Sequence, residues 1–157
     1  MEDLAVRIVR LEPMRVASFH GFGTEPEHAA IQMLAAWAGP RGYLQDRRQH
    51  RIYGFNNPNP SHDSPNYGYE LWMVVGPEVE STDEVPVREF AGGLYAVARC
   101  QGGASITSTW QGLVGWLAAG PYGQAGHQWL EEHLNDAFPA PDTELILDLY
   151  APIAEQR

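Results

Sequence analysis

Two short segments of the chain place a carboxylate two residues before an aromatic ring. They are Glu70-Leu71-Trp72 and Asp148-Leu149-Tyr150, each within a run of residues typical of a β-strand. Alternate residues of a strand point to the same side, so Glu70 shares a face with Trp72, as Asp148 does with Tyr150. Each aromatic face can add about 0.5–2 kcal/mol of cation–π attraction to the pull of the carboxylate. The two segments are therefore compatible with a site for an organic cation, and equally with carboxylates on the solvated face of a half-exposed sheet.

The composition excludes several other chemistries. All ten basic residues of the 157-residue chain are arginines, so Schiff-base chemistry and the lysine-dependent phosphate loop are excluded. Cys100 is the single cysteine, which leaves no internal disulfide and no cysteine-based zinc cluster. His127 and His133 do not follow the zinc-protease helix motif. We expect neither a metal nor a cofactor.

Charge and hydrophobicity limit the partners. The formal net charge of −10 argues against nucleic acid, which requires a basic surface, and suits cationic or neutral ligands. No apolar run approaches the ~18 residues of a membrane span, and the chain opens with acidic residues. We expect a cytoplasmic protein with no membrane contact. A hydrophobic share of 44% in a chain of this length predicts one domain with a true core.

Two helices are predicted to support the strands that carry these residues. Thr24 and Glu27 have the spacing of a capping box, and Gly39-Pro40 ends the helix that follows. Ser108 and Gln111 have the same spacing, although this second helix could begin a turn earlier, and Gly120-Pro121 ends it. Extended segments are predicted at residues 6–9, 15–20, 51–55, 67–75, 86–90, 94–101 and 145–153.

The order of these elements repeats. Val16-Ala17 recurs as Val97-Ala98, Leu34 and Trp37 as Leu113 and Trp116, Asn56 as Asn135, and Glu70-Leu71-Trp72 as Asp148-Leu149-Tyr150. The offsets of 81, 79, 79 and 78 residues indicate a duplicated strand–helix–strand–strand module of roughly 75 residues. The single domain of residues 1–157 would then consist of one module at about 1–77, a polar linker at about 78–84 and a second module at about 85–157.

One segment has conflicting signals. Residues 127–134 favour a helix by propensity, whereas their counterpart around Ile52 to Phe55 favours a strand. The duplication decides in favour of a strand at residues 129–134.

Five stretches together resemble the gyrase-inhibitor-like small-molecule-binding domain, which is also the effector-binding domain of AraC-type and multidrug-responsive MerR-type regulators. They are residues 11–17, 51–58, 67–72, 93–97 and 148–153. The resemblance implies an α+β fold of two strand–helix–strand–strand modules with pseudo-twofold symmetry, an antiparallel sheet, two main helices and a central ligand cleft. It covers this domain without the DNA-binding segment of the regulators, so a stand-alone binding protein is expected.

The resemblance also implies a carboxylate on a sheet strand, buried among aromatic rings, that meets the positive charge of the ligand. Glu70 is favoured over Asp148 for this role, because the aspartate side chain is shorter. Trp110 could face either the cleft or the core. The expected ligand-binding residues are Glu70, Trp72, Tyr53, Phe55, Tyr95, Trp110, Asp148 and Tyr150.

Three functions remain open at this point. The first is sensing or sequestration of amphipathic, aromatic, cationic compounds. The second is a hydrolase of cyclopropane-containing genotoxic natural products, as stand-alone relatives are described, with Glu70 as the catalytic acid–base group and the rings of Trp72 and Tyr53 around the substrate. The third is a protein partner such as a gyrase, which ranks last because 19% charged residues is few for a DNA mimic.

Overall fold

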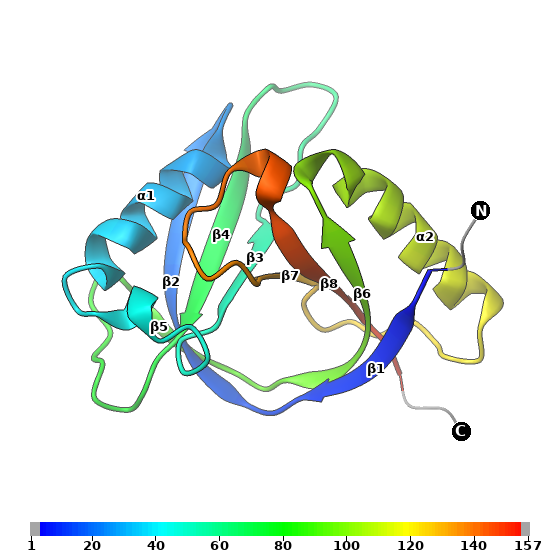
Figure 1. Ribbon diagram of the computed structural model, residues 1–157, viewed down its shortest axis with the longest axis horizontal. Helices are drawn as coiled ribbons and strands as arrows, with labels where there is room; N and C mark the ends of the chain where they lie inside the picture. Colours follow the sequence, from blue (N-terminus) through cyan, green and yellow to red (C-terminus); the bar gives the residue numbers. More distant parts are fainter. Residues whose placement is uncertain (1–3, 155–157) are drawn as a thin grey trace. The chain divides into compact units, whose positions relative to one another are not determined.

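The computed structural model describes residues 4–154, in which strands and helices follow one another in two similar runs (Figure 1). The first run consists of β1 (Val6–Leu11), β2 (Met14–Gly23), α1 (Pro26–Ala38), β3 (Ile52–Asn56) and β4 (Tyr67–Val74). The second consists of β5 (Val87–Phe90), β6 (Gly93–Gln101), α2 (Ile106–Ala119), β7 (Leu130–His133) and β8 (Ile146–Pro152). Three short 3₁₀ turns complete the fold: η1 (Tyr43–Gln45), η2 (Gly103–Ser105) and η3 (Asp142–Glu144).

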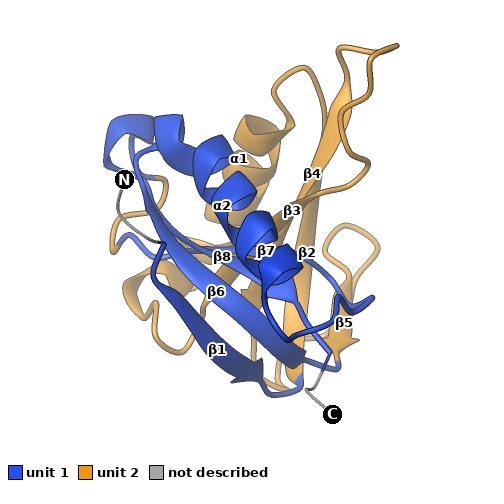
Figure 2. Ribbon diagram, turned by 90° about the vertical axis from the view of Figure 1, so that its right-hand side faces the viewer, with its two compact units in different colours: residues 1–13, 91–135, 140–157 blue, residues 14–90, 136–139 orange. Residues whose placement is uncertain are grey.

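The chain forms two compact units, coloured separately in Figure 2. Unit 2 contains residues 14–90 and 136–139, and its antiparallel strands have the order β3-β4-β2-β5. Unit 1 contains residues 1–13, 91–135 and 140–157, with the antiparallel order β1-β6-β8-β7. The predicted α+β fold of duplicated strand–helix–strand–strand modules is thus confirmed.

The first strand of each run pairs outside its own run. β1 pairs with β6 of the second run, and β5 pairs with β2 of the first. The two compact units therefore do not coincide with modules divided at residues 78–84. A division based on sequence repeats misses this exchange, because it assumes that each module keeps the strand that precedes it.

The strand register gives the alignment of the two repeats. Trp72 lies opposite Ser18 and Tyr53, and Tyr150 lies opposite Val97 and Leu130 in the same pattern. Val97 follows Ser18 by 79 residues, so the offset of 81 expected for the first strands is wrong by two. An even error leaves every side chain on its predicted face, because strands have a period of two.

Each helix covers one face of its own sheet. In unit 2, Leu34 of α1 packs with Leu71 and Met73 of β4, and in unit 1, Leu113 of α2 packs with Leu147 and Leu149 of β8. All five of these leucines and Met73 are at most 2% exposed. The aliphatic residues of β4 and β8 thus face the helices, as alternation predicts, and Glu70 and Asp148 face the other way.

Both predicted capping boxes are wrong. α1 begins one residue later than the Thr24 box requires, with Glu25 at the N-cap and Pro26 in its first turn, and no side chain caps it. α2 begins a turn earlier than the Ser108 box requires, with Ser105 at the N-cap. The Ser/Thr-x-x-Glu/Gln pattern is short, and a proline in the first turn fixes the start of α1 without a side-chain cap. The glycines that end both helices are confirmed at Gly39 and Gly120.

The ambiguous segment at residues 129–134 is a strand, β7, which pairs with β8. Pairing within a sheet outweighs the local helix propensity of this segment, as tertiary context commonly does. Within residues 4–154, neither helix combines the length and apolar character needed to cross a bilayer.

A hydrogen-bonded pair ties the start of α1 to the start of β4. Tyr67 Oη lies 2.7 and 2.8 Å from the two carboxylate oxygens of Glu27. Burial, the hydrogen bond to Glu27, and the negative charges of Glu27 and Glu25 raise the pKa of Tyr67 to about 12. The neutral phenol stabilises the fold fully below the ordinary pKa of 10, and this contribution is lost as the pH rises through 12.

We therefore expect the phenol carbon signal of Tyr67, assigned by Tyr67→Phe, to titrate near pH 12 in an NMR experiment with ¹³C-labelled tyrosine. In Glu27→Gln the midpoint should move toward 10, because the negative partner is gone. An unchanged midpoint in Glu27→Gln would show that the carboxylate does not contribute to the shift.

Candidate ligand-binding site

Glu70 lies in the middle of β4 with its carboxylate buried, at 4% exposure. Ser18 Oγ donates to Glu70 Oε2 at 2.8 Å, and Trp72 Nε1 donates to the same oxygen at 2.7 Å. Asn57 Nδ2 donates to Glu70 Oε1 at 3.1 Å. Because all three donors are neutral, they hold the side chain in place without removing its negative charge.

The backbone around Asn57 positions its side chain as a hydrogen-bond donor to Glu70. Asn57 N–H donates to Gly68 O at 2.8 Å, and Gly68 N–H donates to Pro58 O at 3.0 Å. A Cβ atom on Gly68 would overlap the carbonyl of Asn57, so this close approach requires glycine. His20 Nε2 lies 2.6 Å from the same carbonyl oxygen, and these contacts together bring the Asn57 amide to Glu70.

A row of aromatic rings lies on the same sheet face as Glu70. Trp72 packs edge-on against Phe55 at 4.8 Å between ring centroids and is tilted against Phe90 at 5.2 Å. Phe55 is the residue of β3 opposite Glu70, and Tyr53 is the residue opposite Trp72. The predicted site residues of the first repeat are therefore brought together on one face of unit 2.

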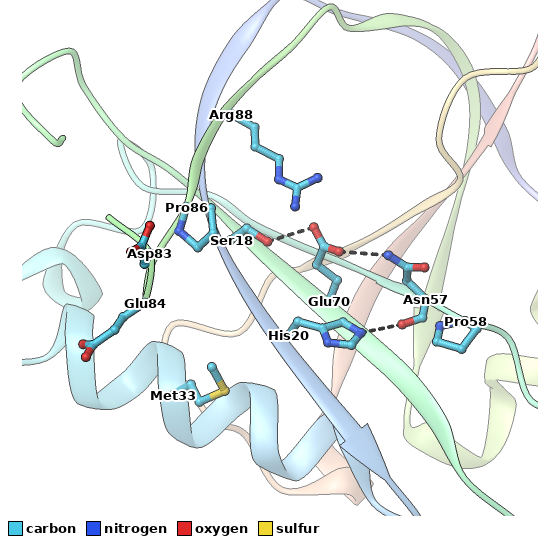
Figure 3. Close-up of a pocket in the computed structure, with 10 residues that line it drawn as sticks. All are labelled: Ser18, His20, Met33, Asn57, Pro58, Glu70, Asp83, Glu84, Pro86 and Arg88. Carbon is cyan, nitrogen blue, oxygen red and sulfur yellow. Dashed lines mark hydrogen bonds between the residues drawn. The ribbon is translucent and has the colours of Figure 1, made fainter. Parts of the chain in front are cut away.

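A pocket of about 530 Å³ opens beside Glu70, along the part of β2 that extends past β5 (Figure 3). Its acidic lining comes from Glu70 and from Asp83 and Glu84 in the segment before β5, while Arg88 supplies a guanidinium. The pocket is lined by Ser18, His20, Met33, Asn57, Pro58, Glu70, Asp83, Glu84, Pro86 and Arg88.

Asp148 occupies the position in unit 1 that corresponds to Glu70, but its charge is balanced. Arg99 Nε and Arg7 Nη2 each lie 2.8 Å from one of its carboxylate oxygens. Burial raises the pKa of Asp148, but the hydrogen bonds and charges of Arg99 and Arg7 outweigh it, so the net pKa lies below the ordinary value of 3.8. A ligand cation at Asp148 would have to compete with two arginines.

Unit 1 contains a second buried carboxylate near the aromatic residues of its repeat. Tyr150 Oη donates to Glu132 Oε1 at 2.6 Å, and Tyr95 packs edge-on against Tyr150 at 5.4 Å between centroids. Glu132 follows Phe55 by 77 residues and is its counterpart in the strand register. Tyr95, Asp148 and Tyr150 thus share one sheet face with Glu132.

Trp110 lies on the other side of that sheet. It packs from α2 against the core cluster that contains Leu147 and Leu149, and its Nε1 donates to Glu131 at 3.2 Å. Of the two orientations left open for this residue, the structure has the core one. Trp110 is not grouped with Tyr95, Asp148 and Tyr150.

The sequence interpretation missed the residues that hold and flank the carboxylates. Three of these residues, Ser18, Asn57 and Arg88, reach Glu70 or its pocket from other strands and loops. The fourth, Glu132, lies in the segment whose sequence signals conflict. A strict alternation rule applied to residues 130–133 would have indicated Glu132. Ser18 could have been found by the corrected repeat offset, but the side chains of Asn57 and Arg88 carry no local signal. Within residues 4–154, no three His, Cys, Asp or Glu side chains group as metal ligands.

Comparison with known proteins identifies the class and the family of this duplicated fold. The chain belongs to the Cass2 family of integron-associated effector-binding proteins, whose family model matches residues 7–153. This confirms the resemblance to the gyrase-inhibitor-like effector-binding superfamily. No curated protein matches the chain in sequence.

Solved structures of the same fold have low sequence identity to this chain. The C-terminal domain of EcmrR is 9% identical with a TM-score of 0.73, over 97% of this chain and 98% of that one. A hydrolase from Listeria innocua is 12% identical with a TM-score of 0.68, over 98% and 94% of the chains. SAV2435, solved with bound tetraphenylphosphonium, is 13% identical with a TM-score of 0.56, over 96% and 94%. At these identities the likeness shows the fold.

Proposed function

We propose that this protein reversibly binds amphipathic aromatic cations, with Glu70 as the counter-ion and the adjoining aromatic row as the apolar wall. One observation carries the proposal: the buried carboxylate of Glu70 has only neutral hydrogen-bond donors among the described residues and lines an open pocket. Such a protein would sense or sequester toxic compounds of varied shape in the cytoplasm.

The electrostatics support a cation over a neutral metabolite. Arg88 lines the same pocket but forms no ion pair with Glu70, so the buried carboxylate is not neutralised by direct contact, and a bound cation offsets the cost of burying its charge. At about 6 Å and an effective dielectric constant of 20–40, the attraction is about 1–3 kcal/mol, or roughly 10- to 100-fold in affinity. Asp83 and Glu84 at the pocket add to the negative potential. Asp148 is less suited to this role, because Arg7 and Arg99 already balance it.

The aromatic row explains how one site could accept several compounds. Trp72 and Phe55 lie outside the pocket lining and are each 7% exposed, so they would form an apolar layer beside Glu70. Contact with such a layer requires less directional matching than hydrogen bonding, so rings of different shape can use it. SAV2435, which shares the fold, was solved with tetraphenylphosphonium, a rigid cation of aromatic rings. That ligand is therefore a suitable probe for this chain.

The proposal is tested by calorimetric titration with tetraphenylphosphonium and with tetraphenylborate, which has nearly the same shape and the opposite charge. We expect the cation to bind at least tenfold more tightly than the anion. In Glu70→Gln, binding of tetraphenylphosphonium should weaken by about tenfold or more. Equal affinity for the two ions, or full affinity in Glu70→Gln, would contradict the proposal.

Glu70→Gln is a matched substitution at this position. The glutamine oxygen can keep the hydrogen bonds from Ser18 and Trp72, and the exposed amide of Asn57 can turn to accept from the new NH₂ group. The fold should therefore stay intact, which unfolding in urea can check. Glu78→Gln, which removes the same charge from a residue outside this pocket, controls for net charge.

A further inference from the structure

One cation lines the same pocket as Glu70. Arg88 lies on β5 opposite Val16 of β2, which places its side chain on the sheet face that also carries Ser18. Figure 3 shows its guanidinium extended from β5 toward the Glu70 carboxylate.

The obvious partner of Arg88 is already used. Glu89, the next residue, pairs with Arg15 at 3.2 Å, and alternation places Glu89 on the opposite face of β5 from Arg88. The side chain of Arg88 forms neither a hydrogen bond nor an ion pair with any residue of the described range 4–154. Its guanidinium donors are therefore available to a ligand.

An aromatic pair lies alongside the two opposite charges. Trp72 is two residues from Glu70 on β4, and Phe90 is two residues from Arg88 on β5, so each ring shares a face with its charged neighbour. The rings of Trp72 and Phe90 pack at 5.2 Å between centroids. These rings lie outside the pocket lining, and they form an apolar layer next to the two charges that do line it, Glu70 and Arg88.

From this arrangement we infer that the preferred ligand is amphoteric: an aromatic ring system that carries both a cationic nitrogen and a carboxylate. This inference rests on the proposed function, because Glu70 still receives the cationic nitrogen. Arg88 receives the ligand carboxylate, for which the planar guanidinium offers two parallel N–H donors. A ligand with a cation alone leaves Arg88 unpaired and is repelled by it.

Rhodamine B and its ethyl ester form a matched pair of probes. At neutral pH both have the same cationic ring system, but only rhodamine B has a free carboxylate. We expect the wild-type protein to bind rhodamine B about tenfold more tightly than the ester, as measured by fluorescence anisotropy at constant ionic strength. Equal affinity for the two dyes, or tighter binding of the ester, would overturn the inference.

Two substitutions separate the inference from the proposed function. Arg88→Gln should weaken rhodamine B by about tenfold while leaving the ester unchanged or slightly tighter. Glu70→Gln should weaken both dyes, because both need the counter-ion. If Glu70→Gln weakens both dyes and Arg88→Gln weakens neither, the cation site stands and the carboxylate site is wrong.

The control for charge is Arg48→Gln, which removes one arginine from an exposed position outside the pocket. It should change neither dye. A selective loss of rhodamine B in Arg48→Gln as well would assign the effect to net charge and overturn the role of Arg88. Arg88→Lys, which keeps the charge but not the paired donors, should recover only part of the affinity for rhodamine B.

Discussion

Replacing Gly21 with alanine should lower the free energy of unfolding by about 3 kcal/mol. Gly21 lies on the face of β2 that α1 covers, where a Cβ atom would overlap Pro26 O and lie 2.9 Å from Ala30 N. Both atoms belong to the backbone of α1, so the helix itself would have to shift. For a domain of this size we expect a fall in Tm of about 10 °C, measured by circular dichroism.

Gly115→Ala provides the matched control for this substitution. Gly115 lies within α2, and a Cβ atom there meets nothing within 4 Å. Alanine should therefore raise the free energy of unfolding by about 0.5–1 kcal/mol, because glycine loses more backbone entropy in a helix. If Gly21→Ala is as mild as Gly115→Ala, the close packing of α1 on β2 is wrong.

The close packing at Gly21 also explains how far the sequence predicts the fold. Leu34 and Trp37 recur as Leu113 and Trp116 at helical spacing, and this recurrence reveals the duplicated module because core positions need apolar residues in both copies. The same logic finds β7 against its helix propensity. Patterns that depend on burial are retained in both copies, and they are the ones that predict correctly.

The exchange of β1 and β5 could not be predicted in this way. Which sheet an edge strand joins is a long-range choice: β1 pairs with residues 93–98, and β5 pairs with residues 14–17. The predicted capping boxes at Thr24 and Ser108 are wrong for a different reason. A four-residue pattern has many chance matches, and a cap stabilises a helix by only about 1 kcal/mol when it forms.

In the candidate site, too, local sequence patterns predict some features, while others depend on residues far away in the sequence. Alternation along β4 places Glu70 beside Trp72, and the register confirms it. Whether a carboxylate keeps its charge for a ligand depends on side chains that arrive from elsewhere in the sequence: Ser18 is 52 residues from Glu70, and Arg7 is 141 residues from Asp148. Two positions that look equivalent in the repeat therefore differ in their electrostatics.

Because Asp148 is paired with two arginines, its replacement is expected to have a large effect on the free energy of unfolding. Its side chain is 5% exposed and accepts from both Arg7 and Arg99, whose side chains are about half exposed. Asp148→Asn should lower the free energy of unfolding at pH 7 by about 2 kcal/mol, because two charge-assisted hydrogen bonds are lost and solvent screens part of their strength. Denaturation in urea at pH 7 measures this change.

The pH dependence of the Asp148 effect tests its cause. Because the arginines lower the pKa of Asp148 in the folded state, its stabilising contribution is fully present above the ordinary pKa of 3.8 and is lost as the pH falls through the lowered value. The difference in the free energy of unfolding between wild type and Asp148→Asn should therefore narrow as the pH falls below 3.8.

In the same variant, the affinity for tetraphenylphosphonium at pH 7 should stay within about twofold of wild type, because this carboxylate is already neutralised by Arg7 and Arg99. A loss of binding as large as that expected for Glu70→Gln would instead place the cation at Asp148.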